Sequence, residues 1–263
     1  MKPYALITGA TSGLGLAYAG YFAREGYNLI ITGRRKEIIE KRAGEIRSQY
    51  GCRTDVILVD LGTEDGVGAL LGQLEGKEVD VLVNNAGFGL GAEFADLDIG
   101  MASQLIFLQT IAVAEITHYV LQGMKQRNRG TIINISSDGA FAVVPKNVVY
   151  ASAKRFLVTF TEGLHMELSG TGIRVQVVCP GFIDSDFHES AGMRVDKSRK
   201  GMFAFRQPEE VVRDAMKGLD RGTVVMIPDR AGKMVKAMAD WLPKKIYYKF
   251  AGGFVKKSLQ KGR

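Results

Sequence analysis

The fold is decided by the stretch Tyr4-Ala5-Leu6-Ile7-Thr8-Gly9-Ala10-Thr11-Ser12-Gly13-Leu14-Gly15. Its first five residues form an apolar run, as expected of a strand buried on both faces. A helical pattern follows and ends near Gly26, and residues 28–32 indicate a second buried strand. A strand, a glycine-rich turn, a helix and another strand form a βαβ unit, so the sequence predicts parallel strands.

The three glycines of the turn have separate predicted roles. Gly9 supplies the backbone freedom of a tight turn, Gly13 leaves no Cβ against a phosphate, and Gly15 lets the helix approach the strand. The helix N-terminus offers free N–H groups and a partial positive charge to a pyrophosphate. A glycine loop without a ligand is the alternative. We expect a nucleotide to contact Gly9, Thr11, Ser12, Gly13, Leu14 and Gly15.

The end of the second strand bears on the choice of nucleotide. It reads Thr32-Gly33-Arg34-Arg35, and no acid appears until Glu37. NAD sites usually place an acid here for the ribose hydroxyls, whereas an arginine accommodates a 2′-phosphate. The sequence therefore favours NADP(H) over NAD(H), with Arg34 as the contact. The alternative is that both arginines are solvated residues at a helix start.

Strands and helices continue to alternate along the chain. Further strands are predicted at 55–59, 79–83, 130–137, 173–178 and 223–227, and helices at 36–49, 63–74, 99–127, 150–164 and 208–219. This alternation predicts an α/β, doubly wound, mostly seven-stranded parallel sheet with helices on both faces. No linker or repeat separates a second domain, so residues 1–263 are predicted to form a single nucleotide-binding domain.

The helix predicted at 99–127 is apolar on more than one face. Such a helix needs more than one partner, so one face is expected to cover the sheet and the other to form a subunit contact. This predicts a homodimer or homotetramer. No uninterrupted apolar run in the chain reaches the ~18 residues of a membrane span, so no spanning helix is predicted.

The net charge of +7 is unevenly spread. Residues 230–263 hold ten Lys/Arg and one acid, a net of +9, so the other 229 residues carry −2. A basic groove for nucleic acid on the main body is therefore not expected. Cys52 and Cys179 lack disulfide or metal-ligand spacing and are predicted to be buried, which indicates a reducing, cytoplasmic location and no metal site.

The basic C-terminal extension, residues 230–263, mixes aromatics with lysines between Trp241 and Phe250. Such a segment can lie on an anionic membrane, at about 1 kcal/mol per basic residue near the surface. The alternative is that its aromatics pack on its own domain while its charges are solvated. The sequence leaves both interpretations open.

Tyr150 and Lys154 supply a candidate acid–base pair. Residues four apart lie on the same face of a helix. A positive charge beside a phenol favours phenolate, so Lys154 is expected to lower the pKa of Tyr150 and make it an acid or base near neutral pH.

With these features in place, the chain resembles the short-chain dehydrogenase/reductase family, whose domain is of the Rossmann type. The resemblance covers about residues 4–227, and its motifs occur in the family's order. They are Thr8 through Gly15, Asp60-Leu61, Asn84-Asn85-Ala86-Gly87, Ser137, Tyr150 through Lys154, and Pro180-Gly181.

The resemblance implies hydride transfer between nicotinamide and a carbonyl carbon. Ser137 and Tyr150 would contact the carbonyl oxygen, Tyr150 would supply the proton, and Lys154 would hold the nicotinamide ribose. By the same matching, Asp60 and Leu61 border the adenine. The residues expected near the ribose, the nicotinamide and its carboxamide are Asn85, Ala86, Gly87, Pro180, Gly181, Ile183 and Ser185.

Gln109 departs from the family pattern, which places an asparagine there to help hold a water that connects the lysine to solvent. The family role rests largely on a backbone carbonyl, so Gln109 is expected to keep a proton relay with altered geometry. The alternative is a catalytically impaired NADP(H)-binding sensor or scaffold. Residues 182–206, rich in Phe and Met, are predicted to form a substrate lid for an apolar ketone, aldehyde or secondary alcohol, or merely to pack a loop.

Overall fold

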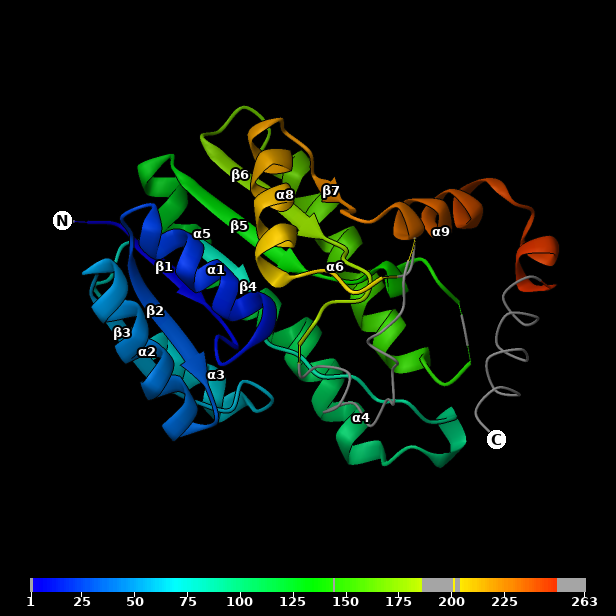
Figure 1. Ribbon diagram of the computed structural model, residues 1–263, viewed down its shortest axis with the longest axis horizontal. Coiled ribbons are helices and arrows are strands. Elements are labelled where there is room, and N and C mark those ends of the chain that lie inside the picture. Colours follow the sequence, from blue (N-terminus) through cyan, green and yellow to red (C-terminus); the bar gives the residue numbers. More distant parts are fainter. Residues whose placement is uncertain (1, 144, 186–200, 202–203, 250–263) are drawn as a thin grey trace.

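The computed structural model describes residues 2–143, 145–185, 201 and 204–249. Seven parallel strands form one sheet in the order β3-β2-β1-β4-β5-β6-β7 (Figure 1). The predicted doubly wound sheet is confirmed. The strands are β1 (Tyr4–Ile7), β2 (Asn28–Gly33), β3 (Thr54–Leu58), β4 (Val79–Asn84), β5 (Gly130–Ile135), β6 (Ile173–Val178) and β7 (Val225–Met226).

Helices cover both faces of the sheet, and each face has its own apolar core. One core joins alternate strand residues such as Ala5 and Ile7 to α1 (Gly13–Arg24), α2 (Lys36–Tyr50) and α8 (Pro208–Asp220). The other joins residues such as Leu6 to α3 (Glu64–Gln73), α5 (Ala112–Arg127) and α6 (Val148–Glu167). Strands buried on both faces explain the continuous apolar runs of the sequence.

The first strand lies at the point where the direction of chain progression reverses. β1 pairs with β2 on one side and with β4 on the other. In open α/β sheets, ligands bind beyond the carboxyl ends of the strands at such a switch point. The turn after β1 and the segment after β4 are therefore placed side by side at the edge where a nucleotide is expected.

The long predicted helix extends over its expected range but is not regular. It runs through α4 (Ile99–Ile106), a π-helical turn η2 (Phe107–Ile111) and α5. The expectation that no helix is able to span a membrane is wrong. By length and composition alone, the helix Ile99–Arg127 is a candidate span: it contains an 18-residue window of mean hydropathy 1.5, of which 39% is buried. Scattered polar residues such as Gln104 and Gln109 interrupt the apolar run without lowering its average.

The C-terminal part differs most from expectation. β7 has two residues where five were predicted, and α9 (Arg230–Trp241) follows it. Two short 3₁₀ turns are also present, η1 (Phe94–Asp96) and η3 (Asp138–Ala140). Most of the predicted lid, 182–206, lies outside the described residues, but its two ends meet: Ile183 pairs with Arg206, and the rings of Phe182 and Phe205 are 5.4 Å apart.

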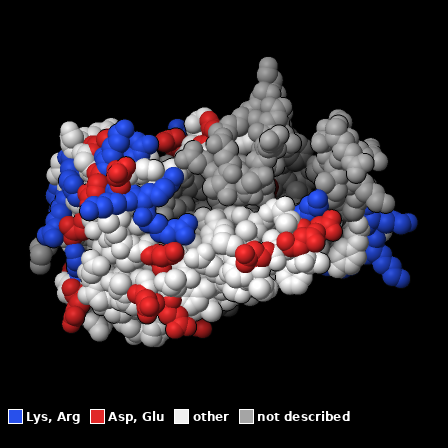
Figure 2. Space-filling view, turned by 90° about the horizontal axis from the view of Figure 1, so that it is seen from below, with Lys and Arg blue, Asp and Glu red and all other residues white. Residues whose placement is uncertain are grey.

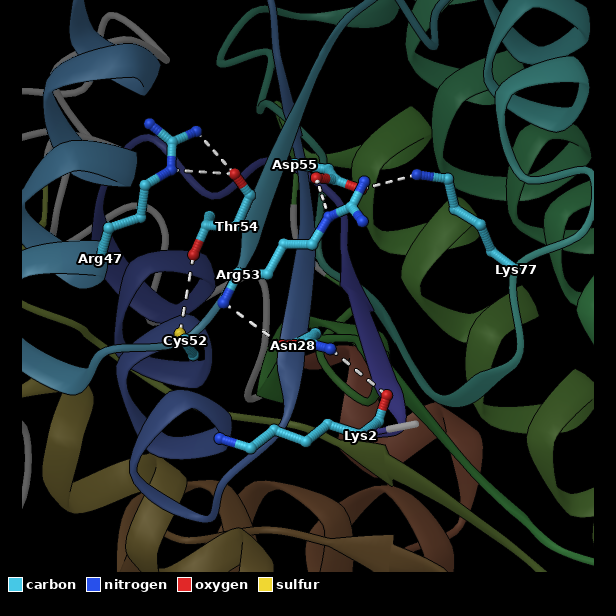
Figure 3. A network of polar contacts seen from close by, with 8 residues as sticks. All are labelled: Lys2, Asn28, Arg47, Cys52, Arg53, Thr54, Asp55 and Lys77. Atoms are coloured by element: carbon cyan, nitrogen blue, oxygen red, sulfur yellow. Dashed lines mark hydrogen bonds and ion pairs between the residues drawn. The ribbon is translucent and has the colours of Figure 1, made fainter.

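The amino end of the sheet is tied together by paired polar groups (Figure 3). Asp55 at the start of β3 accepts from Arg53 at 2.9 Å and from Lys77 at 2.6 Å. Asn28 at the start of β2 donates to the carbonyl of Lys2 at 3.3 Å and accepts from the backbone N–H of Arg53 at 3.2 Å. Cys52, nearby, is buried and free, as is Cys179, so both cysteine predictions are confirmed.

Candidate active site

The turn after β1 is held by Asn85, which follows β4. Asn85 Nδ2 donates to the carbonyl oxygens of Thr8 at 2.9 Å and Gly9 at 3.0 Å. The backbone N–H groups of Asn85 and Ala86 donate to Thr8 Oγ1 at 2.9 and 3.0 Å. A Cβ on Gly15 would lie 2.4 Å from Gly9 O, so the helix approaches the strand as closely as predicted.

The start of α1 fits a nucleotide phosphate. Gly9 and Gly13 have φ values of +68° and +56°, a region that favours glycine. Ser12, the N-cap of α1, makes no capping hydrogen bond with its side chain. A Cβ on Gly13 would lie 3.1 Å from Ser185 Cβ, which places Ser185 against the same turn. A glycine turn before an uncapped helix start suits the pyrophosphate of a nicotinamide dinucleotide.

The two arginines after β2 have different partners. Arg34 Nη1 lies 3.4 Å from Asp60 Oδ2, and both side chains are exposed. Arg35 Nη2 instead donates to Thr11 Oγ1 at 3.0 Å, across the glycine turn. The predicted cofactor contact, Arg34, is thus paired with Asp60, while its neighbour Arg35 is the arginine that reaches the glycine turn. Leu61, next to Asp60, is buried.

Asn84 and Asn134 form a buried chain of side-chain hydrogen bonds. Asn84 Nδ2 donates to Asn134 Oδ1 at 2.9 Å and to Thr117 Oγ1 at 3.0 Å. Asn134 Nδ2 donates in turn to Thr161 Oγ1 at 2.9 Å. The chain joins β4 and β5 to α5 and α6.

Ser137, Tyr150 and Lys154 converge at the carboxyl end of β5. Ser137 follows β5, while Tyr150 and Lys154 lie one turn apart near the start of α6. Lys154 is buried, its Nζ lies 5.5 Å from the centre of the Tyr150 ring, and it donates to Ile135 O at 2.9 Å. The predicted pairing on one helical face is therefore present.

The protonation of this pair differs from the expectation. Burial raises the pKa of Tyr150 well above its ordinary value, and a hydrogen bond with Ser137 opposes that rise. Burial lowers the pKa of Lys154 to about 7. The predicted lowering of the Tyr150 pKa by Lys154 is not found, because burial also disfavours the lysine charge that would cause it.

Two segments after β6 close the same edge. The backbone N–H of Asp138 donates to Pro180 O at 2.9 Å, and the N–H of Gly181 donates to Asp229 Oδ2 at 2.8 Å. Ile183 is buried beside them. Asp138 and Asp229 were not singled out from the sequence, since neither belongs to a motif.

Gln109 lies in the middle of the π-helical turn and is buried. Its Nε2 donates to Phe88 O at 2.7 Å, and a Cβ on Gly87 would lie 3.1 Å from Gln109 Cδ. Among the described residues, its Oε1 has no hydrogen-bond partner. π-Helical turns are frequent at functional sites, and this one sets the Gln109 side chain against the loop after β4.

Comparison with known proteins identifies the family. The chain matches the family model described as short chain dehydrogenase over residues 3–195. It therefore belongs to the short-chain dehydrogenase/reductase family, and the resemblance drawn from its motifs is confirmed.

Individual relatives support the same assignment. The chain is 35% identical over 245 residues to a very-long-chain 3-oxoacyl-CoA reductase of Anas platyrhynchos, which covers 91% of this chain and 74% of that protein. It is 36% identical over 191 residues to sulfoacetaldehyde reductase 2 of Chromohalobacter salexigens. That match covers 71% of this chain and 75% of the relative. The solved structure of a short-chain dehydrogenase from Sphingobium yanoikuyae in complex with NADPH matches this one with a TM-score of 0.81 at 30% sequence identity. The match covers 92% of this chain and 96% of that chain. The chain is thus an oxidoreductase of this family, with a nicotinamide cofactor and a small-molecule substrate.

The prediction of a cytoplasmic location is wrong. It is contradicted by relatives named for very-long-chain acyl substrates and by the Ile99–Arg127 helix, which is a candidate membrane span. Very long acyl chains partition into bilayers, since each buried CH₂ contributes about 0.8 kcal/mol. The sequence argument rested on cysteine usage and on uninterrupted apolar runs, and neither measures affinity for lipid.

Proposed function

We propose that this protein is an NADPH-dependent reductase of apolar ketones, with 3-oxoacyl thioesters as the substrate class to test first. The observation that carries the proposal is the convergence of Ser137, Tyr150 and Lys154 beside the glycine turn. The apolar substrate is supported by the relatives named as very-long-chain 3-oxoacyl-CoA reductases.

In the proposed reaction, a nicotinamide cofactor held at the glycine turn would supply the hydride that the carbonyl carbon accepts. The Ser137 hydroxyl donates a hydrogen bond to the carbonyl oxygen, and Tyr150 transfers its phenolic proton to that oxygen as charge develops there. Lys154 positions the ribose. Because burial keeps Tyr150 protonated at neutral pH, it is set to act as an acid, which favours the reduction direction.

Turnover tests this function directly. Purified protein is mixed with NADPH and a series of 3-oxoacyl thioesters and simple ketones of increasing chain length, and loss of NADPH absorbance is followed. We expect kcat/KM to rise with chain length. NADPH binding without turnover of any member of the series would support the sensor or scaffold alternative instead.

The preference for NADPH is proposed to depend on Arg35 as well as Arg34. The Arg35 guanidinium reaches Thr11 across the turn, whereas Arg34 is paired with Asp60. A 2′-phosphate would meet the Arg35 guanidinium there, which is hydrogen-bonded to a hydroxyl and not to the Asp60 carboxylate. We expect Arg35→Ala to weaken NADPH binding about tenfold and NADH binding little. Lys36→Ala, a neighbouring loss of one positive charge, is the matched control.

We also propose that the C-terminal extension lies on anionic membranes. Trp241 is 86% exposed and Tyr248 is 56% exposed, and Lys244, Lys245 and Lys249 are exposed around them. Basic side chains lie at this end of the molecule in Figure 2, where α9 lies in Figure 1. Exposed aromatics among lysines are typical of an interfacial segment.

This segment is attached to the body close to the catalytic edge. The Tyr247 hydroxyl donates to Phe141 O and accepts from the N–H of Val143, both at 2.9 Å. Pelleting with vesicles that contain phosphatidylserine tests the proposal. We expect Trp241→Ser with Tyr248→Ser to reduce pelleting several-fold, whereas Phe94→Ser, an exposed aromatic elsewhere, leaves it unchanged. Equal pelleting of all three proteins would contradict a tail contact.

A homodimer or homotetramer is proposed from the outer face of α4 and α5. Ile99, Ile106 and Ile111 are exposed there, while Leu105 packs against α6 and Ile116 packs against the sheet. Sedimentation of the wild type and of Ile106→Lys tests this proposal, and a monomeric wild type at micromolar concentration would contradict it.

A further inference from the structure

The Ser137 hydroxyl is hydrogen-bonded to the next residue in the chain. Ser137 Oγ donates to Asp138 Oδ1 at 3.2 Å and accepts from the backbone N–H of Gly139 at 3.0 Å. A serine hydroxyl has a single proton to donate. Ser137 also hydrogen-bonds with Tyr150. Its contact with Asp138 directs the hydroxyl proton to a carboxyl group of the protein itself, although the proposed reaction needs that proton at a substrate oxygen.

Asp138 is held in this position by close packing. Its N–H donates to Pro180 O at 2.9 Å. A Cβ on Gly181 would lie 3.2 Å from Asp138 Oδ2 and 3.4 Å from Asp229 Oδ2, so the two carboxyl groups flank one glycine. A Cβ on Gly232, in α9, would lie 3.1 Å from Asp138 Cβ. The residue is therefore fixed by the end of β6 and by α9.

The titratable groups around Asp138 come from three other elements. They are Asp229 before α9, Tyr150 on α6 and Cys179 after β6. The Asp229 carboxylate has a cation beside it: Arg206 Nη1 lies 3.7 Å from Asp229 Oδ1, and Arg206 Nη2 lies 2.7 Å from Asp214 Oδ2. None of these contacts puts a positive charge directly on Asp138.

Among the described residues, the charge of the Asp138 carboxyl group is stabilised by hydrogen bonds from Ser137 and from the backbone of Gly139. Burial raises the pKa of Asp138 to about 6; the hydrogen bond from Ser137 opposes the rise, and repulsion from Asp229 adds to it. Asp138 thus changes charge within the pH range in which an enzyme is ordinarily assayed.

We propose that Asp138 is a positioning residue that competes with the substrate carbonyl oxygen for the Ser137 proton. The inference rests on the proposed function, because it concerns Ser137 as a donor to substrate. An ionised Asp138 is the stronger competitor, since charge-assisted hydrogen bonds are roughly twice as strong as neutral ones. A protonated Asp138 releases the Ser137 proton to the substrate. Only a hydrogen bond changes partner, and no covalent bond is made or broken.

The direction of the pH effect follows from this competition. The ionised fraction of Asp138 increases as the pH rises through 6. We therefore expect kcat/KM for ketone reduction to fall roughly fivefold between pH 5 and pH 7.5, which is the scale of exchanging a charged for a neutral acceptor.

A pH profile tests the proposal on the full chain with NADPH and the best ketone of the turnover series. Three proteins are compared: wild type, Asp138→Asn and Asp220→Asn, which alters an exposed acid paired with Arg174 on the far side. We expect an inflection near pH 6 in the wild type and in Asp220→Asn. Asp138→Asn is expected to lose this inflection, and its kcat/KM at pH 7.5 is expected to be about fivefold higher than that of the wild type. An inflection near pH 6 that persists in Asp138→Asn, or a wild type without one, would overturn the proposal. An inflection near pH 7 common to all three proteins is assigned to Lys154.

A second measurement does not depend on turnover. Carboxyl ¹³C NMR of the full chain follows the titration of Asp138 in the wild type, in Ser137→Ala and in Asp229→Asn. Removing Ser137 is expected to raise the Asp138 pKa, and removing the Asp229 charge to lower it. If no ketone is reduced, the proposed function fails, and these spectra alone decide the inference. An Asp138 that titrates near pH 4, or does not respond to Ser137→Ala, would refute it.

Discussion

At the two ends of the β-sheet, the surroundings shift the pKa values of titratable side chains in opposite directions: toward the charged form at the amino end and toward the neutral form at the carboxyl end. At the amino end, partial burial would raise the pKa of Asp55, but hydrogen bonds from Arg53 and Lys77 hold it below its ordinary value (Figure 3). At the carboxyl end, Tyr150, Lys154 and Asp138 all have pKa values shifted toward their neutral forms.

This difference separates a structural edge from a reactive one. Ionised groups with partners at the amino end stabilise the sheet modestly. At the carboxyl end, burial disfavours the charged forms of Tyr150, Lys154 and Asp138. This burial costs stability, and shifted pKa values of this kind are typical of functional sites. Substitutions at the two ends should therefore have opposite effects on stability.

The largest effects on activity and stability are expected when Lys154, at the carboxyl end, and Lys77, at the amino end, are each replaced by methionine. Lys154→Met should lower kcat about a thousandfold, because Tyr150 and the ribose lose their partner, and should raise the free energy of unfolding by about 2 kcal/mol at pH 7. Lys77→Met should leave kcat unchanged and destabilise the protein by about 0.5–1 kcal/mol. Steady-state kinetics and denaturant unfolding measure both. A Lys154→Met protein less stable than wild type would contradict the comparison.

The pH dependence of that stability has a definite sign. Burial lowers the pKa of Lys154 from 10.5 to about 7, so the unfolded chain binds more protons between these values. The wild type is then expected to gain stability as the pH rises from 7 to 10.5, and the advantage of Lys154→Met to shrink over the same range.

A second test compares two glycines of α1. A Cβ on Gly15 would lie 2.4 Å from Gly9 O and 2.5 Å from Asn85 Nδ2, whereas a Cβ on Gly20 would meet only Tyr50 Oη at 3.7 Å. Gly15→Ala is expected to weaken NADPH binding about a hundredfold by displacing the turn. Gly20→Ala should bind NADPH normally and be up to about 1 kcal/mol more stable. Fluorescence titration with NADPH measures both affinities. Equal NADPH affinity of Gly15→Ala and Gly20→Ala would show that the turn tolerates the methyl group, against the prediction.

Adjacent asparagines after β4 offer a third test. Asn84→Ala breaks the buried chain to Asn134 and Thr117, so it should cost about 2–3 kcal/mol of stability. Asn85→Ala frees the glycine turn and should weaken NADPH binding about tenfold with a smaller loss of stability. Thermal unfolding and NADPH titration separate the two roles, and identical profiles for both variants would mean that neither asparagine is specialised.

The smallest effect is expected at Gln109. Gln109→Asn shortens the side chain by one CH₂ and removes the hydrogen bond to Phe88 O. The loss of about 1 kcal/mol should lower kcat three- to fivefold, because the loop after β4 is less firmly held. A kcat equal to or above that of wild type would show that this bond is not needed for turnover.

The sheet and its glycine turn were predictable because they depend on local patterns. Apolar runs identify strands buried on both faces, and the spacing of Gly9, Gly13 and Gly15 records close approaches that the structure reproduces. Tyr150 and Lys154 were also placed correctly, since helical spacing alone puts them on one face.

The electrostatics of the site were not predictable in the same way. Asp138 meets Asp229 only because α9 returns to the end of β6, some 90 residues along the chain. The π-helical turn at Gln109 has no sequence signature that we recognised. The pKa of Lys154 depends on how fully other elements cover it, which helical spacing does not reveal.

The central claim is that the carboxyl edge is a working reductase site, and one measurement tests it most directly. NADPH consumption with the series of 3-oxoacyl thioesters is compared in wild type and Tyr150→Phe, with NADPH affinity measured in both. We predict saturable turnover in the wild type and at least a hundredfold loss in Tyr150→Phe at unchanged NADPH affinity. Turnover that survives in Tyr150→Phe, or NADPH binding without turnover in the wild type, would contradict the account.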